Sequence, residues 1–338
     1  MSTIKGDIYK SLFHFPENDC SSRNPTSSYY FQMWDGDEVK IVPYNISGID
    51  YYVNNITGND NNDGLSRDTA VAEINRAIIL SEAARLASWG GVTLTNHTLK
   101  NRIHVQGTGI SYAAITSPPS FCDIIAEGAT PYGDGSGIVV VSGKSTTSPT
   151  PAIAGTARGL GLYGIQFETS GDCYVLDFVN LFRSEIYFCG IKASDPTLVT
   201  VATTGGVRFT GNSGGNYIHE NMWMGGNDSW FTYGITTGSD VVIFNENRIE
   251  NNFIEAATAG MYVAAETVTG DNTHVVRNHF TGGNHTLAVS VDDNSTVGRI
   301  LYCGNYCGST DGGQLFNNGA IRWVGNYRAN GFSTVTAS

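Results

Sequence analysis

The chain has 338 residues, of which 41 are glycine, 9 are proline and 41% are hydrophobic, so it can bury a large core. The formal net charge of −12, with no basic run to offset it, argues against nucleic acid and anionic membranes as partners. No segment approaches the roughly 18 consecutive apolar residues that a membrane span needs, so we expect no membrane insertion.

Residues 1–48 mix aromatic residues with turn formers and show no repeat. Phe13, Phe15 and Trp34 make this segment too aromatic for a plain disordered tail. We expect an arm or docking segment that packs on its own β body, on a sister subunit or on a larger assembly. The first residues lack the apolar core of a secretion signal, so synthesis in a cytoplasm is expected.

The next segment predicts a strand, a turn and a helix in that order. A β-rich run from Asp50 leads into an Asn/Asp/Gly cluster at 59–64, and helix formers follow over about 69–89. Asp68 or Thr69 is the expected helix cap. The apolar face of the helix would consist of Val71, Ile74, Ala77 and Ile78.

Neither of two possible metal sites fits its chemistry. Asn59, Asn61 and Asp63 partly match a calcium loop, but the twelfth position, which should be glutamate, is Ala70. Cys303 and Cys307 lie four residues apart without a second ligand pair, which favours buried thiols on one face. We therefore predict no metal and no cofactor.

An asparagine recurs in strand-like segments near the carboxyl end. Asn251, Asn278 and Asn305 follow one another at intervals of 27 residues, with looser copies at Asn221 and Asn326. A fixed period of this length is typical of a solenoid, in which each repeat buries its apolar side against its neighbours. Amides stacked inside such a solenoid would bond to one another as a structural ladder.

Strand alternation predicts which side chains share the inner face with these amides. The predicted inward residues are His219, Ile249, Val276, Cys303 and Val324 before the amides, and Trp223, Phe253, Phe280, Cys307 and Arg328 after them. Glu250 and Arg277 fall in the outward column between, where an exposed ion pair across adjacent coils is expected.

The segment from Asp50 to Ile78 resembles the start of right-handed parallel β-helix proteins of the pectin-lyase-like superfamily. Short strands and glycine corners of the early coils are similar too: Ile103–Val105, Asp123–Gly128, Gly137–Val141 and Leu160–Phe167. The resemblance implies an all-β, right-handed parallel β-helix over residues 49–338, with the helix plugging its first coil. It is specific for architecture and leaves the function open.

Catalysis has little support in the sequence. Asp292 and Asp293 form the Asp-Asp pair of polygalacturonase-type hydrolases, but the Gly-His-Gly and Arg-Ile-Lys companions are missing, and so are clustered calcium ligands. As fallback candidates, Glu266 and Asp293 would stack on adjacent coils at a spacing suited to a retaining glycosidase. The competing interpretation is an exposed acidic turn. Trp230 and Tyr233 are candidate sugar contacts.

The combination of an acidic solenoid, an aromatic arm and no clear active site resembles phage virion components. We therefore expect a structural virion protein of the tailspike, fibre-associated or capsid decoration type, serving display or host attachment. The resemblance implies a homotrimer, contacts with other virion proteins through the arm, and contact with host surface polysaccharide. The alternative is a polysaccharide depolymerase, either a glycoside hydrolase or a lyase.

Overall fold

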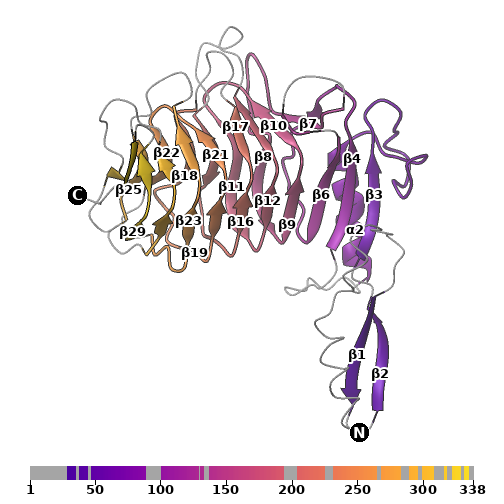
Figure 1. Cartoon of the computed structure of the whole chain (residues 1–338). Coiled ribbons are helices and arrows are strands. Elements are labelled where there is room, and N and C mark those ends of the chain that lie inside the picture. The colour runs from indigo at the N-terminus through magenta and orange to yellow at the C-terminus, as the bar shows by residue number, and fades with distance from the viewer. Residues whose placement is uncertain are drawn as a thin grey trace.

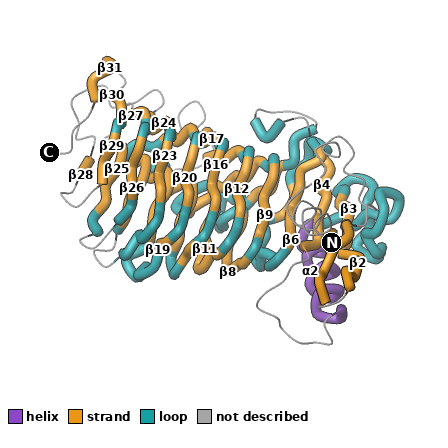
Figure 2. The backbone as a smooth tube through the Cα atoms, turned by 60° about the horizontal axis from the view of Figure 1, so that its bottom comes forward, coloured by secondary structure: helices purple, strands orange, loops and turns teal. Residues whose placement is uncertain are grey.

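The computed structural model describes residues 29–35, 38–44, 47–88, 100–128, 130–132, 137–193, 204–224, 231–264, 268–282, 289–295, 299–307, 316–317, 322–328 and 331–334. It is an all-β structure in which parallel strands stack into three long sheets, the arrangement of a β-solenoid (Figure 1). From β6 (Cys122–Glu127) to β28 (Phe316–Asn317), each coil adds one strand to sheet I, then one to sheet II, then one or two to sheet III. The sheets wrap around a common interior (Figure 2).

The strands of each sheet are as follows. Sheet I contains β3 (Ser47–Val53), β4 (Lys100–Gln106), β6 (Cys122–Glu127), β9 (Leu160–Tyr163), β12 (Glu185–Tyr187), β16 (Tyr217–His219), β20 (Arg248–Glu250), β23 (His274–Val276), β26 (Leu301–Cys303) and β29 (Arg322–Val324). Sheet II contains β5 (Tyr112–Ala113), β7 (Val140–Ser142), β10 (Gln166–Thr169), β13 (Gly190–Ala193), β17 (Met222–Met224), β21 (Phe253–Glu255), β24 (His279–Thr281), β27 (Tyr306–Cys307), β30 (Tyr327–Arg328) and the antiparallel β31 (Gly331–Thr334). Sheet III contains β8 (Ile153–Arg158), β11 (Tyr174–Phe182), β14 (Gly205–Phe209), β15 (Ser213–Gly214), β18 (Tyr233–Thr237), β19 (Phe244–Asn245), β22 (Ala259–Val263), β25 (Val289–Asp293) and β28 (Phe316–Asn317).

The amino-terminal region holds a hairpin and a helix. Strands β1 (Tyr29–Asp35) and β2 (Glu38–Tyr44) pair antiparallel in a sheet of their own, and residues 1–28 of the predicted arm lie outside the described residues. Helix α2 (Ile74–Ser88) packs on β3, β4 and β5 through a buried face of Ile74, Ala77, Ile78 and Ser81. No helix in the described part of the chain is long and apolar enough to cross a membrane.

The predicted caps of this helix are wrong. Asp60 accepts the backbone N–H groups of Ala72 and Glu73 just before the helix begins. The Thr69 hydroxyl instead donates to Asp63, within the preceding turn. The turn folds back on itself, so a carboxylate distant in sequence reaches the helix N-terminus, which local spacing does not reveal.

A left-handed residue bends the chain between sheet I and sheet II. In successive coils this position is Glu220 (φ 54°), Asn251 (φ 54°), Arg277 (φ 54°), Gly304 (φ 63°) and Gly325 (φ 59°). Such a φ permits a sharp corner and interrupts the alternation of side chains between the two strands. The next residue in each coil points back into the solenoid.

That next residue is the asparagine of the ladder. Its members are Asn221, Asn252, Asn278, Asn305 and Asn326. From Asn252 onwards, each Oδ1 accepts from the backbone N–H and the side-chain amide of the asparagine one coil before, and Asn221 Oδ1 accepts the backbone N–H of Cys189. The prediction is wrong for Asn251, which is exposed at the left-handed corner, while its neighbour Asn252 is buried. The step from Asn252 to Asn278 is 26 residues, so the equal spacing of 27 misplaced this coil by one residue.

Because of this corner, the inner column of sheet I differs from the predicted one. Its inward sheet I residues are Ile218, Ile249, Val275 and Tyr302, each three residues before a ladder asparagine. His219, Val276, Cys303 and Val324 instead lie in the neighbouring column of sheet I. After the corner, Trp223, Phe280 and Cys307 are buried, whereas Phe253 lies in the outer column beside Met222. Cys303 and Cys307 therefore do not share one face, and the Arg328 side chain lies outside the described residues.

A second polar column, which the sequence did not suggest, lines the corner between sheets III and I. Ser184 Oγ accepts the backbone N–H of Leu160, and Asn216 Oδ1 accepts that of Ser184. Asn247 and Thr273 continue the column in the next two coils. Buried side chains thus satisfy backbone donors at two corners of the coil.

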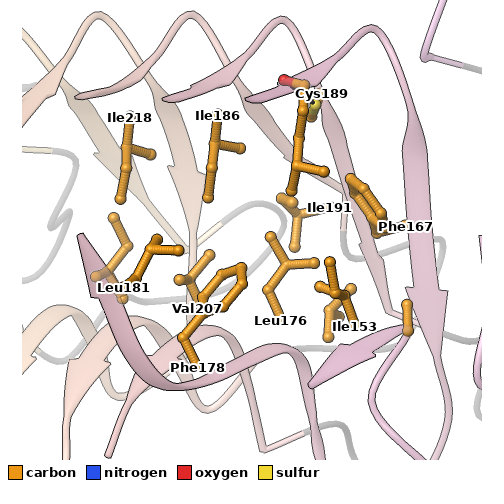
Figure 3. Packing of buried hydrophobic residues seen from close by; sticks show 14 of the residues in the cluster. Ile153, Phe167, Leu176, Phe178, Leu181, Ile186, Cys189, Ile191, Val207 and Ile218 are labelled. Atoms are coloured by element: carbon orange, nitrogen blue, oxygen red, sulfur yellow. Dashed lines mark hydrogen bonds between the residues drawn. The ribbon is translucent and has the colours of Figure 1, made fainter. Parts of the chain in front are cut away.

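The interior is filled from all three sheets. Ile186 and Ile218 of sheet I face Leu181 and Val207 of sheet III (Figure 3). A column of glycines in sheet III, at Gly206, Gly234 and Gly260, makes room for the large inward side chains of sheet II, which are Trp223, Ile254 and Phe280. A Cβ at any of these glycines would collide with that neighbour or with a carbonyl of the next coil.

Candidate functional site

Polar and aromatic side chains gather on the outer face of sheet I. The group, called here the sheet I patch, consists of Lys100, Asp123, Tyr163, Glu185, Tyr187, Tyr217 and His219. Their strands are held in register by buried neighbours, since Ile124, Leu162, Ile186 and Ile218 point inward from the same strands. Alternation along each strand then sends the flanking residues to the outer face.

Asp123 and Glu185 lie in one column with Gly161 between them. Because Gly161 has no side chain, Asp123 Oδ1 and the Tyr163 hydroxyl both lie over it, and the hydroxyl is 2.8 Å from the position of a Cβ there. The Tyr163 hydroxyl also donates to Glu185 Oε2 at 2.7 Å. The Tyr163 side chain therefore fills the space over Gly161, beside the Asp123 carboxyl, and links this column to Glu185.

The two carboxyls have pKa values shifted in opposite directions. Burial raises the pKa of Asp123; Lys100, with Nζ 2.6 Å from Oδ1, opposes this shift, and the charge of Glu185 adds to it. Burial would also raise the pKa of Glu185, but hydrogen bonds from Tyr163 and His219 outweigh it and lower that pKa. Such a divergence between neighbouring acids is typical of acid and base partners, although ion-pair networks also produce it.

His219 is held in a fixed orientation. Its Nε2 donates to Glu185 Oε1 at 2.9 Å. Its ring stacks on Tyr217, with centroids 3.7 Å apart, and on Tyr187, with centroids 4.6 Å apart. The aromatic rings thus form a rigid platform beside a carboxylate, an arrangement that can stack on the apolar face of a sugar while bonding to its hydroxyls.

Glu250 extends the patch towards the next coils. It pairs with Arg277, as the sequence suggested, and also with Arg248, while the Tyr217 hydroxyl donates to Glu250 Oε2 at 3.1 Å. The Glu250 side chain is only 2% exposed, so the pair is not the fully exposed one expected. Its carboxylate is fully engaged and serves to hold Tyr217 in place.

The predicted catalytic pair is not found in the structure as a pair. Glu266 lies outside the described residues. Asp293 is buried in β25, accepts from the N–H and hydroxyl of Ser295 and from the Tyr302 hydroxyl, and has a pKa raised mainly by burial. It is an internal polar group rather than an exposed acid of a turn.

The predicted sugar contacts lie elsewhere on the coil. Trp230 lies outside the described residues. Tyr233, in β18 of sheet III, is half-buried and stacks on Tyr262 of the next coil with centroids 5.0 Å apart. The Tyr233–Tyr262 pair is therefore a second aromatic surface, separate from the sheet I patch.

The residues of the two metal-like motifs have other interactions in the structure. Among the described residues, no group of three or more His, Cys, Asp or Glu side chains could hold a metal ion. In the turn at 59–64, Asp60 and Asp63 accept hydrogen bonds from the backbone and from Thr69. Burial raises the pKa of Cys307 to about 12, which makes this thiol unreactive at neutral pH.

Sequence reasoning missed the sheet I patch, although a signal was present. The tripeptides Glu185-Ile-Tyr187, Tyr217-Ile-His219 and Arg248-Ile-Glu250 repeat one pattern, an inward isoleucine between two outward polar or aromatic residues. The asparagine spacing marks the corner between sheets I and II and carries no information about the outward residues of the strand before it.

Comparison with protein-family models, with curated proteins and with solved structures finds no match to this chain.

Proposed function

We propose that this chain is a structural virion protein of a bacteriophage, of the tailspike or decoration type, and that its sheet I patch contacts a host surface glycan. In this proposal the solenoid is a right-handed parallel β-helix whose first coil is capped by α2. The observation that carries the proposal is the rigid set of Tyr187, Tyr217 and His219 rings beside the Glu185 carboxylate on an outer face. Aromatic rings that stack on the apolar face of a sugar, next to a charged carboxylate that accepts hydrogen bonds from its hydroxyls, are suited to binding sugars.

A binding experiment tests the glycan contact. The purified full chain is titrated with bacterial capsular polysaccharides and lipopolysaccharide O-chains, with Tyr187→Ala and Tyr262→Ala compared with the unsubstituted protein. Tyr187→Ala should lose about 1.5 kcal/mol of stacking energy, which corresponds to roughly tenfold weaker binding of the glycan. Tyr262→Ala should leave the affinity unchanged. Weakening by Tyr262→Ala alone would place the contact on sheet III and overturn the assignment.

The expected partners belong to the same proposal. A homotrimer would cover outer sheet faces, and sheet II offers an outward column of Met222, Phe253, His279 and Tyr306, two of whose members are at least 36% exposed. Light scattering of the purified protein should give three times the chain mass. Deletion of residues 1–48 should abolish docking on virion proteins while leaving glycan binding intact; intact docking would refute the role of the arm.

A further inference from the structure

We propose that Phe188 and Tyr132 extend the sheet I patch around the corner between sheets I and II, where they bind a second sugar residue of the glycan. This inference rests on the proposed glycan contact and deepens it, because it adds two binding residues and a direction along which the glycan runs. Neither residue lies in a strand of sheet I, and neither was a candidate in the sequence.

Phe188 occupies a position that its side chain does not favour. It is the left-handed residue of the corner that follows β12, with φ 51°, and the equivalent residue in other coils is Gly164, Gly304 or Gly325. A bulky residue in this conformation costs free energy. Its side chain gains little from burial, since it is 40% exposed. A large aromatic residue that the backbone disfavours and that solvent reaches indicates a role in binding.

Tyr132 is held over the same corner by contacts with two coils. Its hydroxyl donates to the carbonyl oxygen of Glu220 at 3.1 Å, and Glu220 is the corner residue of the next coil. The preceding residue, Pro131, places its carbonyl oxygen against Gly190, where a Cβ would collide with it. The Tyr132 ring meets the Phe188 ring edge to face, with centroids 5.3 Å apart. The two rings are therefore fixed relative to each other before any ligand binds, which lowers the entropic cost of binding.

The aromatic series continues from this corner into the sheet I patch. The Phe188 centroid lies 6.1 Å from that of Tyr187, and the Tyr187 centroid lies 4.6 Å from that of His219. The planes of Phe188 and Tyr187 are tilted by 42°, since the chain turns at Phe188. Neighbouring rings of this kind can stack on consecutive sugar residues. A glycan that stacks on Tyr187 would thus place its next residue on Phe188 and Tyr132.

The charges beside these rings indicate the class of sugar. Burial raises the pKa of Tyr132 to about 12, and the charge of Glu220 adds to this shift, so the Tyr132 hydroxyl stays protonated. At the other end of the series, Glu185 accepts a hydrogen bond from His219. Both ends of the aromatic series therefore carry a carboxylate, which repels an acidic ligand. The second sugar residue is accordingly uncharged rather than a uronic acid.

Replacement by glycine separates a binding role from a structural one. Phe188→Gly removes the ring and supplies the residue that the corner favours, so the backbone of the corner should be retained. The matched control is Phe121→Gly. Phe121 has φ 52° at the corner between sheets III and I, where Gly159 and Gly215 occupy the equivalent position in other coils. Both variants of the full chain, and Tyr132→Ala, are titrated with neutral O-chains and capsular polysaccharides, with polygalacturonate as the acidic comparison, and their thermal melts are recorded.

We expect Phe188→Gly and Tyr132→Ala each to weaken binding of the neutral glycan roughly tenfold, the effect of losing one stacked ring. Because the two rings contact each other, the double variant should weaken binding by less than the product of the two single effects. Phe121→Gly should leave the affinity unchanged. The melting temperature of Phe188→Gly should not fall, because glycine relieves the left-handed backbone. A purely structural role predicts the reverse, which is a lower melting temperature and an unchanged affinity.

The outcomes distinguish this inference from the proposed function. If Tyr187→Ala weakens binding while Phe188→Gly and Tyr132→Ala bind the glycan as tightly as the unsubstituted protein, the glycan contact stands and its extension around the corner is wrong. Absence of binding to every probe would overturn both. An equal loss of affinity in Phe121→Gly, or a loss in Phe188→Gly together with a lower melting temperature, would assign the effect to folding and overturn the binding role. Tighter binding of polygalacturonate than of the neutral glycans would overturn the inferred class of sugar.

Discussion

The amide ladder gives a sharp test, because two adjacent asparagines occupy opposite environments. Asn252 is buried, accepts from the backbone N–H and the amide of Asn221, and donates to the Ile218 carbonyl at 2.9 Å and to Asn278. Asn251 is exposed at the left-handed corner. The perturbations are Asn252→Ala and, as the matched control, Asn251→Gly.

The magnitude follows from the groups that lose a partner. In Asn252→Ala the backbone N–H of Asn221 loses its acceptor and the Ile218 carbonyl loses its side-chain donor, while the side-chain amide of Asn221 keeps its bond to the Ile186 carbonyl. At about 1–3 kcal/mol for each of the two groups, the free energy of unfolding should fall by about 2 kcal/mol or more. Asn251→Gly places glycine where Gly304 and Gly325 already occupy the equivalent corner, so its effect should stay within about 1 kcal/mol.

Urea unfolding of both variants, followed by fluorescence of the buried Trp223, measures the difference. If Asn252→Ala costs less than about 1 kcal/mol, or if Asn251→Gly costs as much as Asn252→Ala, the ladder does not run through Asn252. The equal spacing of 27 residues would then be the better guide to the register.

Two further substitutions examine the interior. Asp293→Ala leaves the Tyr302 hydroxyl buried without its acceptor and should cost about 1–3 kcal/mol, whereas Asp293→Asn keeps an acceptor for Ser295. Because burial raises the pKa of Asp293, the folded protein holds the Asp293 proton to a higher pH than the unfolded chain does, so the free energy of unfolding falls as the pH rises above about 4. Thermal melts of Asp293→Asn across this pH range should lack the fall. A fall that persists in Asp293→Asn would exclude Asp293 as its source. Gly260→Ala would push a Cβ against Phe280 and should lower the free energy of unfolding by about 1–3 kcal/mol. The double variant Gly260→Ala/Phe280→Leu should recover part of that stability in the same thermal melts. An unchanged melting temperature of Gly260→Ala would show that the close packing is not needed.

Periodicity revealed the stacking of coils and most of the ladder because both depend on side chains that recur once per coil. The register within each coil was harder to predict, since it depends on backbone conformation at one residue. Glu220 and Arg277 adopt the left-handed conformation without being glycine, so nothing in their identity marks the corner. The alternation carried through this corner therefore placed His219 and Val276 on the wrong face.

The candidate site could be predicted only in part. The cross-coil pair of Glu250 with Arg277 followed from alternation, because both lie close to an identified asparagine. Asp123 and Glu185 are 62 positions apart and become neighbours only through the register of β6, β9 and β12. The pKa divergence of the two acids depends on Lys100, Tyr163 and His219, which come from three different coils.

The most direct measurement is a crystal structure of the protein with an oligosaccharide of the glycan that it binds best. The proposal predicts a sugar ring stacked on Tyr187 or Tyr217, with a sugar hydroxyl within hydrogen-bond reach of the Glu185 carboxylate. An oligosaccharide bound only at Tyr233 and Tyr262, or anywhere else away from Tyr187 and Tyr217, would contradict it.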